Sequence, residues 1–188
     1  MIASWHLEKL RAHSGVAIVL SLLWLALLFM FAGSAAYNCL AFLFGELLII
    51  LAIFDYYYYH LFNTWVAGLG GLALLPILLG KISLLDAVSG SILGGIFMYL
   101  LRLCTRGGIG LGDVKFSLAL GLWLGFYNVI VAIFLAFLMG GLFASYLLLM
   151  RKSSLKTRVA FGPFLAIGGM IAYIFAPDIW ELYRNLLW

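Results

Sequence analysis

Residues 116–150 contain no charged side chain, and this stretch most constrains what the chain can fold into. As one α-helix it would measure roughly 52 Å at 1.5 Å per residue, well beyond the ~30 Å of hydrocarbon in a bilayer. We therefore expect two spans here, separated by a turn at Gly125-Phe126-Tyr127-Asn128. Helices are favoured over a β-barrel because the apolar runs are long and do not alternate with a period of two.

The composition indicates that the whole chain is embedded in a membrane. Of its 188 residues, 66% are hydrophobic and 10% are charged, whereas soluble domains carry about 25% charged residues. A soluble globule of this size could not bury so much apolar surface in one core. We predict an all-α, polytopic helical membrane protein with six to seven transmembrane helices. The expected spans are residues 15–34, 37–54, 64–80, 84–102, 112–125, 127–149 and 159–177.

The basic residues predict the orientation of these spans. With the amino terminus in the cytoplasm, nine of the 11 Lys and Arg residues fall in inner segments, and only Lys81 and Arg184 fall in outer ones. The formal net charge of +4 is therefore a topology signal rather than a nucleic-acid-binding surface. The inner residues are Lys9, Arg11, Arg102, Arg106, Lys115, Arg151, Lys152, Lys156 and Arg158.

The first apolar segment also has an alternative interpretation as a secretory signal peptide, because basic residues precede it and the small residues 32–36 follow it. We favour a retained helix, since the run is long for a signal peptide. We divide the chain into residues 1–36, a cytoplasmic segment with the first transmembrane helix, and residues 37–188, one membrane domain. Cys39 and Cys104 are expected at opposite membrane faces, too far apart for a disulfide.

Three carboxylates, Glu46, Asp55 and Asp113, are expected at membrane depth, where charge is costly and therefore informative. Asp55 closes the second span and Asp113 opens the fifth, so the parity of crossings places both at the cytoplasmic face. Two carboxylates within hydrogen-bonding distance share a proton, and one then activates water while the other protonates a carbonyl, as in aspartic proteases. The residues also allow two interfacial carboxylates that are solvated or paired with cations of that face. Those cations are Arg102, Arg106 and Lys115.

Glu46 lies nine residues before Asp55, on the opposite helix face and about 13 Å deeper along the axis. It either hydrogen-bonds to a neighbouring helix or belongs to a proton or ion pathway. The second possibility leaves an alternative function, a proton- or ion-coupled small transporter that uses Glu46, Asp55 and Asp113 and needs a polar path across the bilayer. We attribute the remaining carboxylates to solvation at span ends. These are Glu8, Asp86, Asp178 and Glu181.

Glycine dominates the segment before Asp113, where residues 107, 108, 110 and 112 are all Gly. Such a segment permits the close approach of an extended peptide. The pattern is neither a phosphate-binding P-loop nor a dinucleotide site. We interpret the glycines of 90–94, with Gly121 and Gly125, as contacts between helices. The tail 178–188 is expected outside the membrane, with an interfacial belt of Trp180, Tyr183 and Trp188, and Tyr56 to Tyr59 are assigned to a similar belt.

Two motifs carry a resemblance to a known family. Gly110-Leu111-Gly112-Asp113-Val114-Lys115 resembles the Gly-x-Gly-Asp motif of the intramembrane aspartyl peptidases, in the form used by type IV prepilin peptidases. Phe161-Gly162-Pro163-Phe164 resembles the Phe-Gly-Pro-Phe stretch near the end of those enzymes. Asp55 falls where the family's first aspartate stands, and the resemblance covers roughly residues 40–188. Asp86-Ala87, with Gly90, Gly94 and Gly95, fits the helix between the two catalytic segments.

The resemblance implies a bacterial inner-membrane aspartic endopeptidase that removes the short basic leader of type IV prepilins or type II secretion pseudopilins at the cytoplasmic face. Asp55 and Asp113 would be its catalytic pair. Its partners would be that substrate and the lipid bilayer, with no nucleic acid, metal or cofactor, and the oligomeric state is not readable. The residues that would support the motif or the substrate are Gly110, Gly112, Lys115, Asn63, Gly162 and Pro163.

The sequence departs from the family in two places. The family usually shows Ile-Pro-Asn or Ile-Pro-Asp after the first aspartate, whereas here Leu61-Phe62-Asn63 follows Tyr56 to His60 without the proline. Asn63 keeps its place. Many members also N-methylate the new terminus through a module with paired Cys-x-x-Cys motifs. With Cys39 and Cys104 as its two cysteines, the sequence predicts a peptidase without this module.

Overall fold

The computed structural model describes residues 14–31, 35–150 and 159–187, and every regular element within them is an α-helix. This agrees with the predicted all-α fold. Several earlier expectations concern residues outside the described ranges, namely Glu8, the basic residues 9, 11, 151, 152, 156 and 158, the small residues 32–34, and Trp188. The helices are α2 (Ser14–Phe31), α3 (Ala35–Tyr58), α4 (Asn63–Leu72), α5 (Leu74–Leu78), α6 (Leu84–Cys104), α7 (Leu111–Leu149) and α8 (Gly162–Leu187).

By length and composition, three of the described helices can cross a membrane: Asn38–Tyr58 of α3, Leu84–Cys104 and Leu111–Leu149. Helix α8 makes a fourth if its two parts count as one span. These parts, Gly162–Ala176 and Asp178–Asn185, are bent by 65° relative to each other. The apolar helices Ser14–Met30 and Asn63–Leu78 are shorter. The chain is therefore a polytopic helical membrane protein, and the number of six to seven crossings stays a prediction.

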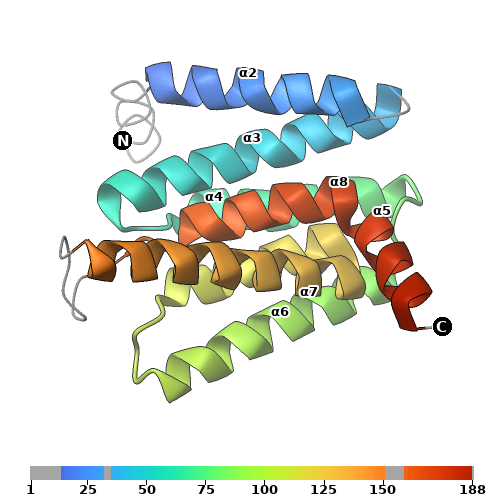
Figure 1. Cartoon of the computed structure of the whole chain (residues 1–188). Coiled ribbons are helices and arrows are strands. Elements are labelled where there is room, and N and C mark those ends of the chain that lie inside the picture. Colours follow the sequence, from blue (N-terminus) through green and yellow to red (C-terminus); the bar gives the residue numbers. More distant parts are fainter. Residues whose placement is uncertain (1–13, 32–34, 151–158, 188) are drawn as a thin grey trace.

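Helix α7 turns back on itself at Gly125, where the backbone leaves the helical region with φ 78° and ψ −177°. A Cβ atom on Gly94 of α6 would lie 2.9 Å from Ser117 Oγ and 3.3 Å from Val129 Cγ2. In one straight helix those two residues would be about 18 Å apart. The two halves of α7 run side by side in opposite directions (Figure 1), so the predicted turn is confirmed.

Glycines let α6 and the α7 turn approach until their backbones touch. A Cβ atom on Gly90 would lie 2.4 Å from the carbonyl carbon of Gly125 and 2.7 Å from the carbonyl oxygen of Gly121. Conversely, a Cβ atom on Gly121 would lie 2.3 Å from the carbonyl oxygen of Gly90. The expectation that these glycines form helix contacts is confirmed, because no side chain fits between the two backbones.

Solvation does not account for Asp86, and this corrects the expectation from sequence. Its Oδ1 accepts a hydrogen bond from the backbone N–H of Phe126 at 2.9 Å, and its side chain is only partly exposed. Asp86 lies in the first turn of α6, and it caps the second half of α7 across the bundle. The carboxylate also occupies the space beside Gly125, where an added Cβ atom would lie 2.3 Å from Oδ2.

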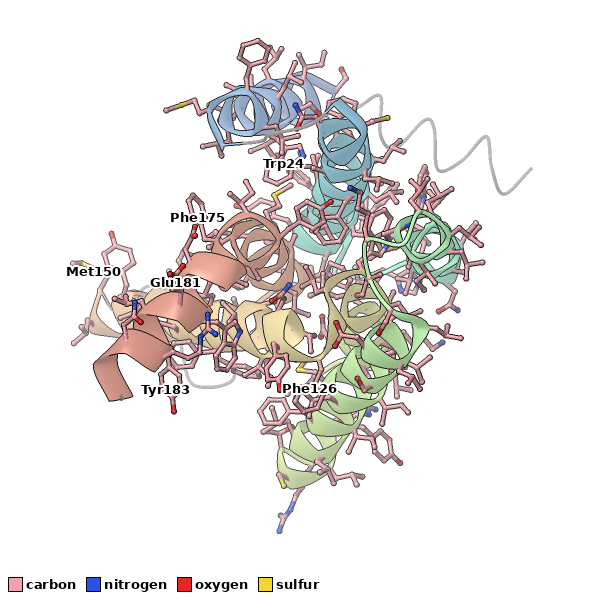
Figure 2. The ribbon with its side chains drawn as sticks, turned by 90° about the vertical axis from the view of Figure 1, so that its right-hand side faces the viewer. Trp24, Phe126, Met150, Phe175, Glu181 and Tyr183 are labelled. Atoms are coloured by element: carbon pink, nitrogen blue, oxygen red, sulfur yellow. The ribbon has the colours of Figure 1, made fainter. Side chains whose placement is uncertain are left out.

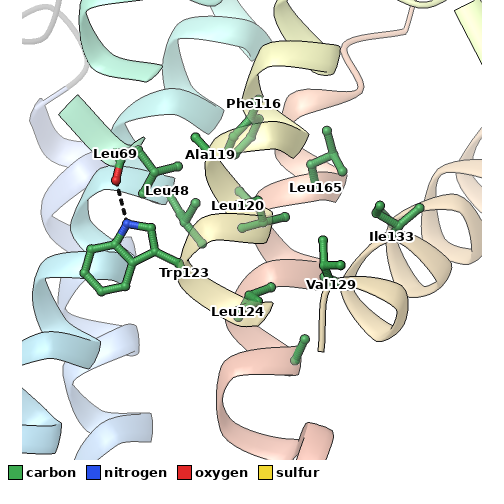
Figure 3. Close-up of a cluster of buried hydrophobic side chains, with 14 of the residues drawn as sticks. Leu48, Leu69, Phe116, Ala119, Leu120, Trp123, Leu124, Val129, Ile133 and Leu165 are labelled. Atoms are coloured by element: carbon green, nitrogen blue, oxygen red, sulfur yellow. Dashed lines mark hydrogen bonds between the residues drawn. The ribbon is translucent and has the colours of Figure 1, made fainter. Parts of the chain in front are cut away.

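The core is assembled from α3, α4, α7 and α8. Leu48, Leu120 and Leu165 are fully buried where α3, α7 and α8 meet (Figure 3). The indole N–H of Trp123 donates a 2.6 Å hydrogen bond to the carbonyl oxygen of Leu69, which ties α7 to α4. A buried indole N–H needs such a partner. The expected span 64–80 is split into α4 and α5, since Pro76 has no N–H to donate to the carbonyl of Leu72.

Helix α2 packs on α3 at the edge of the bundle, with Trp24 between them (Figure 2). The Trp24 indole donates to the carbonyl oxygen of Ala41 at 3.0 Å. Glu46 Oε2 accepts a hydrogen bond from Ser21 Oγ of α2 at 2.8 Å. Of the two interpretations of Glu46, the structure therefore shows the hydrogen bond to a neighbouring helix.

The carboxyl-terminal tail is a continuation of α8, not a separate extension. The helix bends by 65° between Ala176 and Asp178, at a proline that cannot donate a backbone hydrogen bond. The bent part, which carries Glu181 and Tyr183, lies over the end of the bundle shown in Figure 2. The Trp180 ring lies 5.4 Å from the Tyr127 ring and 5.6 Å from the Tyr183 ring, so the tail packs against the α7 turn.

Candidate active site

Two buried carboxylates face one cavity at the end of the bundle where α3 and α6 end and α4, α7 and α8 begin, on the left of Figure 1. Asp55 lies in the last turn of α3 and is 7% exposed; Asp113 lies in the first turn of α7 and is 8% exposed. Both side chains line a cavity of about 350 Å³. The fold thus brings together the two aspartates that the order of crossings placed at one membrane face.

Asp113 is held by the start of its own helix. The N–H of Gly110, the residue that caps α7, donates to Asp113 Oδ2 at 3.2 Å. This contact is half of a capping box, and the positive end of the helix dipole favours a carboxylate in this position. The other oxygen, Oδ1, is buried and has no hydrogen-bond partner among the described residues. One oxygen of Asp113 therefore fixes the side chain, while the other can accept a hydrogen bond from a bound molecule.

Asp55 is held by the start of a different helix. The N–H of Gly162, the first residue of α8, donates to Asp55 Oδ2 at 2.7 Å. Asp55 lies near the carboxyl end of α3, where the dipole disfavours a negative charge, so the donor from α8 offsets an unfavourable position. A Cβ atom at position 162 would lie 2.7 to 2.9 Å from Asp55 Oδ2, Cβ and Cγ. Only a residue without a side chain fits there.

The wall of the cavity contains most of the residues that the sequence predicted around the pair. Gly110, Gly112, Asn63 and Lys115 all line it. Lys115 Nζ donates to Asn63 Oδ1 at 2.9 Å and so links the first turn of α7 to the first turn of α4. Asn63 makes this bond although no proline precedes it.

The basic residues at this end of the bundle do not pair with Asp55 or Asp113. Lys115 bonds to Asn63, and the guanidinium of Arg102 donates to the carbonyl oxygen of Ile109. Arg106 is exposed on the loop before α7. The interpretation of Asp55 and Asp113 as partners of these three cations is therefore wrong.

Some predicted residues lie elsewhere, and some cavity residues were missed. Pro163 follows Gly162 but borders a separate pocket between α2, α3 and α8. Glu46 is not among the residues that line the cavity. His60 and Leu111 had no predicted role in a site, and Tyr59 was expected in an interfacial belt. The position of His60, five residues after Asp55, was the signal in the sequence that could have placed His60 at the cavity. The additional lining residues are Tyr59, His60, Leu61 and Leu111.

The described residues contain no group of three or more His, Cys, Asp or Glu side chains that could hold a metal ion. Cys39 and Cys104 are free and exposed. In this cavity Asp55 and Asp113, each with a backbone N–H donor, offer a pair of carboxylates that can transfer protons.

The fold and the site define an α-helical membrane protein with two aspartates buried in one cavity. Residues 42–145 match the type IV leader peptidase family, and the chain belongs to this family. The matched range contains Asp55, Asn63 and the Gly-x-Gly-Asp motif, and it ends before Gly162.

Curated proteins similar to this chain carry the name prepilin leader peptidase/N-methyltransferase. The protein of Aeromonas salmonicida (strain A449) is 37% identical over 123 residues, which is 63% of this chain and 42% of that protein. The protein of Pseudomonas putida is 36% identical over 107 residues, 54% of this chain and 37% of that protein. The protein of Bacillus subtilis (strain 168) is 29% identical over 152 residues, 78% of this chain and 59% of that protein. The chain thus spans only part of the length of these relatives. No solved structure matches it.

Proposed function

We propose that this chain is an aspartic endopeptidase of the bacterial inner membrane that removes the leader peptide of prepilins or type II secretion pseudopilins, with Asp55 and Asp113 as its catalytic pair. The observation that carries the proposal is the shared cavity, in which both aspartates are buried and each accepts a backbone N–H from the start of a helix. Family membership and the names of the relatives supply the substrate class.

The mechanism uses the two carboxyl groups with one proton between them. The ionised carboxylate takes a proton from a water molecule as that water attacks the scissile carbonyl carbon, and the protonated partner gives its proton to the carbonyl oxygen. The resulting diol then breaks down. The carboxylate that gave up its proton takes one back from a hydroxyl of the diol, the carboxyl group that took the proton of water gives it to the amide nitrogen, and the C–N bond breaks. Asp113 Oδ1, which has no hydrogen-bond partner among the described residues, is suited to orient the water.

The cavity wall suits an extended peptide. Gly110 and Gly112 line the cavity beside the pair, and because neither carries a side chain, a peptide backbone can approach the wall closely at these two positions. We assign Lys115 and Asn63 to the support of this wall, since their hydrogen bond joins two helix starts at its rim. Gly162 supports Asp55 directly, and Pro163 follows it at the start of α8.

We further propose that the cavity opens at the cytoplasmic face, with the amino terminus on the same side. The support is the distribution of basic residues, because Arg102, Arg106 and Lys115 accompany the helix ends around the cavity while Lys81 precedes α6 at its other end. A leader rich in basic residues stays on the cytoplasmic side for the same reason, so this orientation would present its cleavage site to the cavity.

The test is co-expression with a prepilin, comparing leader cleavage by the wild type, Asp55→Ala and Asp113→Ala. Loss of either catalytic carboxyl should lower the cleavage rate by about 10²–10⁴-fold. Asp178→Ala is the matched control, since this carboxylate is exposed on α8 and should leave cleavage unchanged. If Asp55→Ala or Asp113→Ala still processes the prepilin at the wild-type rate, the pair is not catalytic.

A further inference from the structure

The loop between α6 and α7 has a defined shape that starts at the end of α6. The N–H of Gly107 donates to the carbonyl of Arg102 at 2.9 Å, and the N–H of Arg106 donates to the carbonyl of Leu103 at 3.1 Å. Together they form a Schellman motif, the usual way to end a helix with a sharp change of direction. Arg106 and Gly107 have φ of 50° and 88°. The chain therefore folds back, and residues 108–110 pass the last turn of α6.

The side chain of Arg102 uses this geometry to reach the loop. Its guanidinium donates a hydrogen bond to the carbonyl oxygen of Ile109. That carbonyl belongs to the same peptide unit as the N–H of Gly110, which donates to Asp113 Oδ2 at 3.2 Å. Arg102, one peptide unit and Asp113 thus form a continuous chain of hydrogen bonds.

We propose that Arg102 is a positioning residue for Asp113, which it orients and stabilises through the Ile109–Gly110 peptide unit; the inference rests on the proposed function. A cation bound to the carbonyl side of a peptide unit makes its N–H a stronger donor, since linked hydrogen bonds polarise one another. The guanidinium keeps its charge at any physiological pH, so this effect is permanent.

Orientation of the peptide unit matters as much as its polarity. Gly108 and Gly110 flank Ile109, and glycine imposes little barrier to rotation of a neighbouring peptide plane. A rotation by half a turn would present the carbonyl oxygen of Ile109 to the carboxylate of Asp113 in place of the N–H. Arg102 prevents this rotation because its own bond is made only when the carbonyl points towards α6.

The experiment measures kcat and KM of purified Arg102→Met and Arg102→Lys on a prepilin substrate. Arg102→Met should lower kcat about tenfold to a hundredfold, as expected for a displaced catalytic group, while KM changes about twofold or less. Arg102→Lys keeps a cationic donor and should recover part of kcat. Arg106→Met is the matched control, because this exposed arginine lies in the same loop and has no side-chain hydrogen bond among the described residues; it should keep the wild-type kcat.

Hydrogen exchange of the segment 105–112 gives a readout that needs no substrate. Faster exchange in Arg102→Met, with wild-type exchange in Arg106→Met, supports the positioning role. Wild-type kcat and wild-type exchange in Arg102→Met overturn it, as does an equal effect of the two Met variants. If Asp55→Ala and Asp113→Ala cleave normally, the proposed function fails, and the exchange experiment still decides whether Arg102 holds the loop.

Discussion

Replacing Gly162 with Ala tests whether the contact between α8 and Asp55 controls activity. Gly162 begins α8 and does not have a positive φ, so alanine is compatible with its backbone. The added methyl group would lie 2.7 Å from Asp55 Oδ2 and 2.8 Å from Asp55 Cβ. A rotation of the carboxylate cannot relieve the second contact, because Cβ is fixed to the α3 backbone. The start of α8 and the end of α3 must therefore move apart.

The size of the effect follows from this movement. Carbon atoms pack at about 3.5–4.0 Å, so the separation must grow by roughly 0.7–1.2 Å. Displacement of a catalytic group by about 1 Å can cost about a hundredfold in rate. The charge-assisted hydrogen bond from the Gly162 N–H, now 2.7 Å long, would also weaken, and such bonds contribute about 1.5–3 kcal/mol. We expect cleavage to fall about 10- to 100-fold.

The assay is the initial rate of leader cleavage by purified Gly162→Ala in detergent or nanodiscs, with thermal unfolding measured on the same samples. Gly141→Ala is the matched control, because a Cβ atom there meets no other atom within 4 Å and the substitution should leave the rate unchanged. The protein should remain folded, since the strain is confined to one contact. A Gly162→Ala variant that cleaves at the wild-type rate would refute the link between this contact and the reaction.

Substitutions at three further positions test the fold. Asp86→Ala removes the acceptor for the Phe126 N–H and should lower the free energy of unfolding by about 1 kcal/mol, which a lower melting temperature would show. Asp86→Asn keeps an acceptor oxygen and should retain most of this stability. In Gly90→Val the new Cβ atom would lie 2.4 Å from the carbonyl carbon of Gly125. Because the backbone cannot give way, we expect loss of the folded peak in size-exclusion chromatography. A normal peak would contradict this contact. Arg106→Gly removes a non-glycine residue with φ 50° and should stabilise the protein by about 1 kcal/mol, so an unchanged or lower melting temperature would argue against strain at this position.

The features that could be predicted from sequence follow from one-dimensional rules. The turn at Gly125 is predictable because an uncharged stretch of this length exceeds the bilayer and must be divided. The convergence of Asp55 and Asp113 is predictable from the parity of crossings, and their shared cavity bears it out. Both inferences use positions along the chain, and neither needs knowledge of which helices touch.

The features that escaped prediction depend on partners that the sequence does not mark. Asp86 was assigned to solvent because its partner is a backbone N–H 40 residues away, and any residue except proline supplies such a donor. Arg102 was counted as a basic residue that indicates topology. Its partner, the carbonyl of Ile109, is a backbone group that the sequence does not mark. The split at Ala73 was readable from Pro76 and was missed because the apolar composition continues across it.

The contact between Gly162 and Asp55 has a consequence for biosynthesis. Asp55 is synthesised 107 residues before Gly162. Until α8 emerges and docks, the first carboxylate of the proposed pair lacks its backbone donor. The two-aspartate centre therefore reaches its full geometry only when the last described helix has been synthesised, so under the proposed function cleavage should become efficient only after α8 has docked.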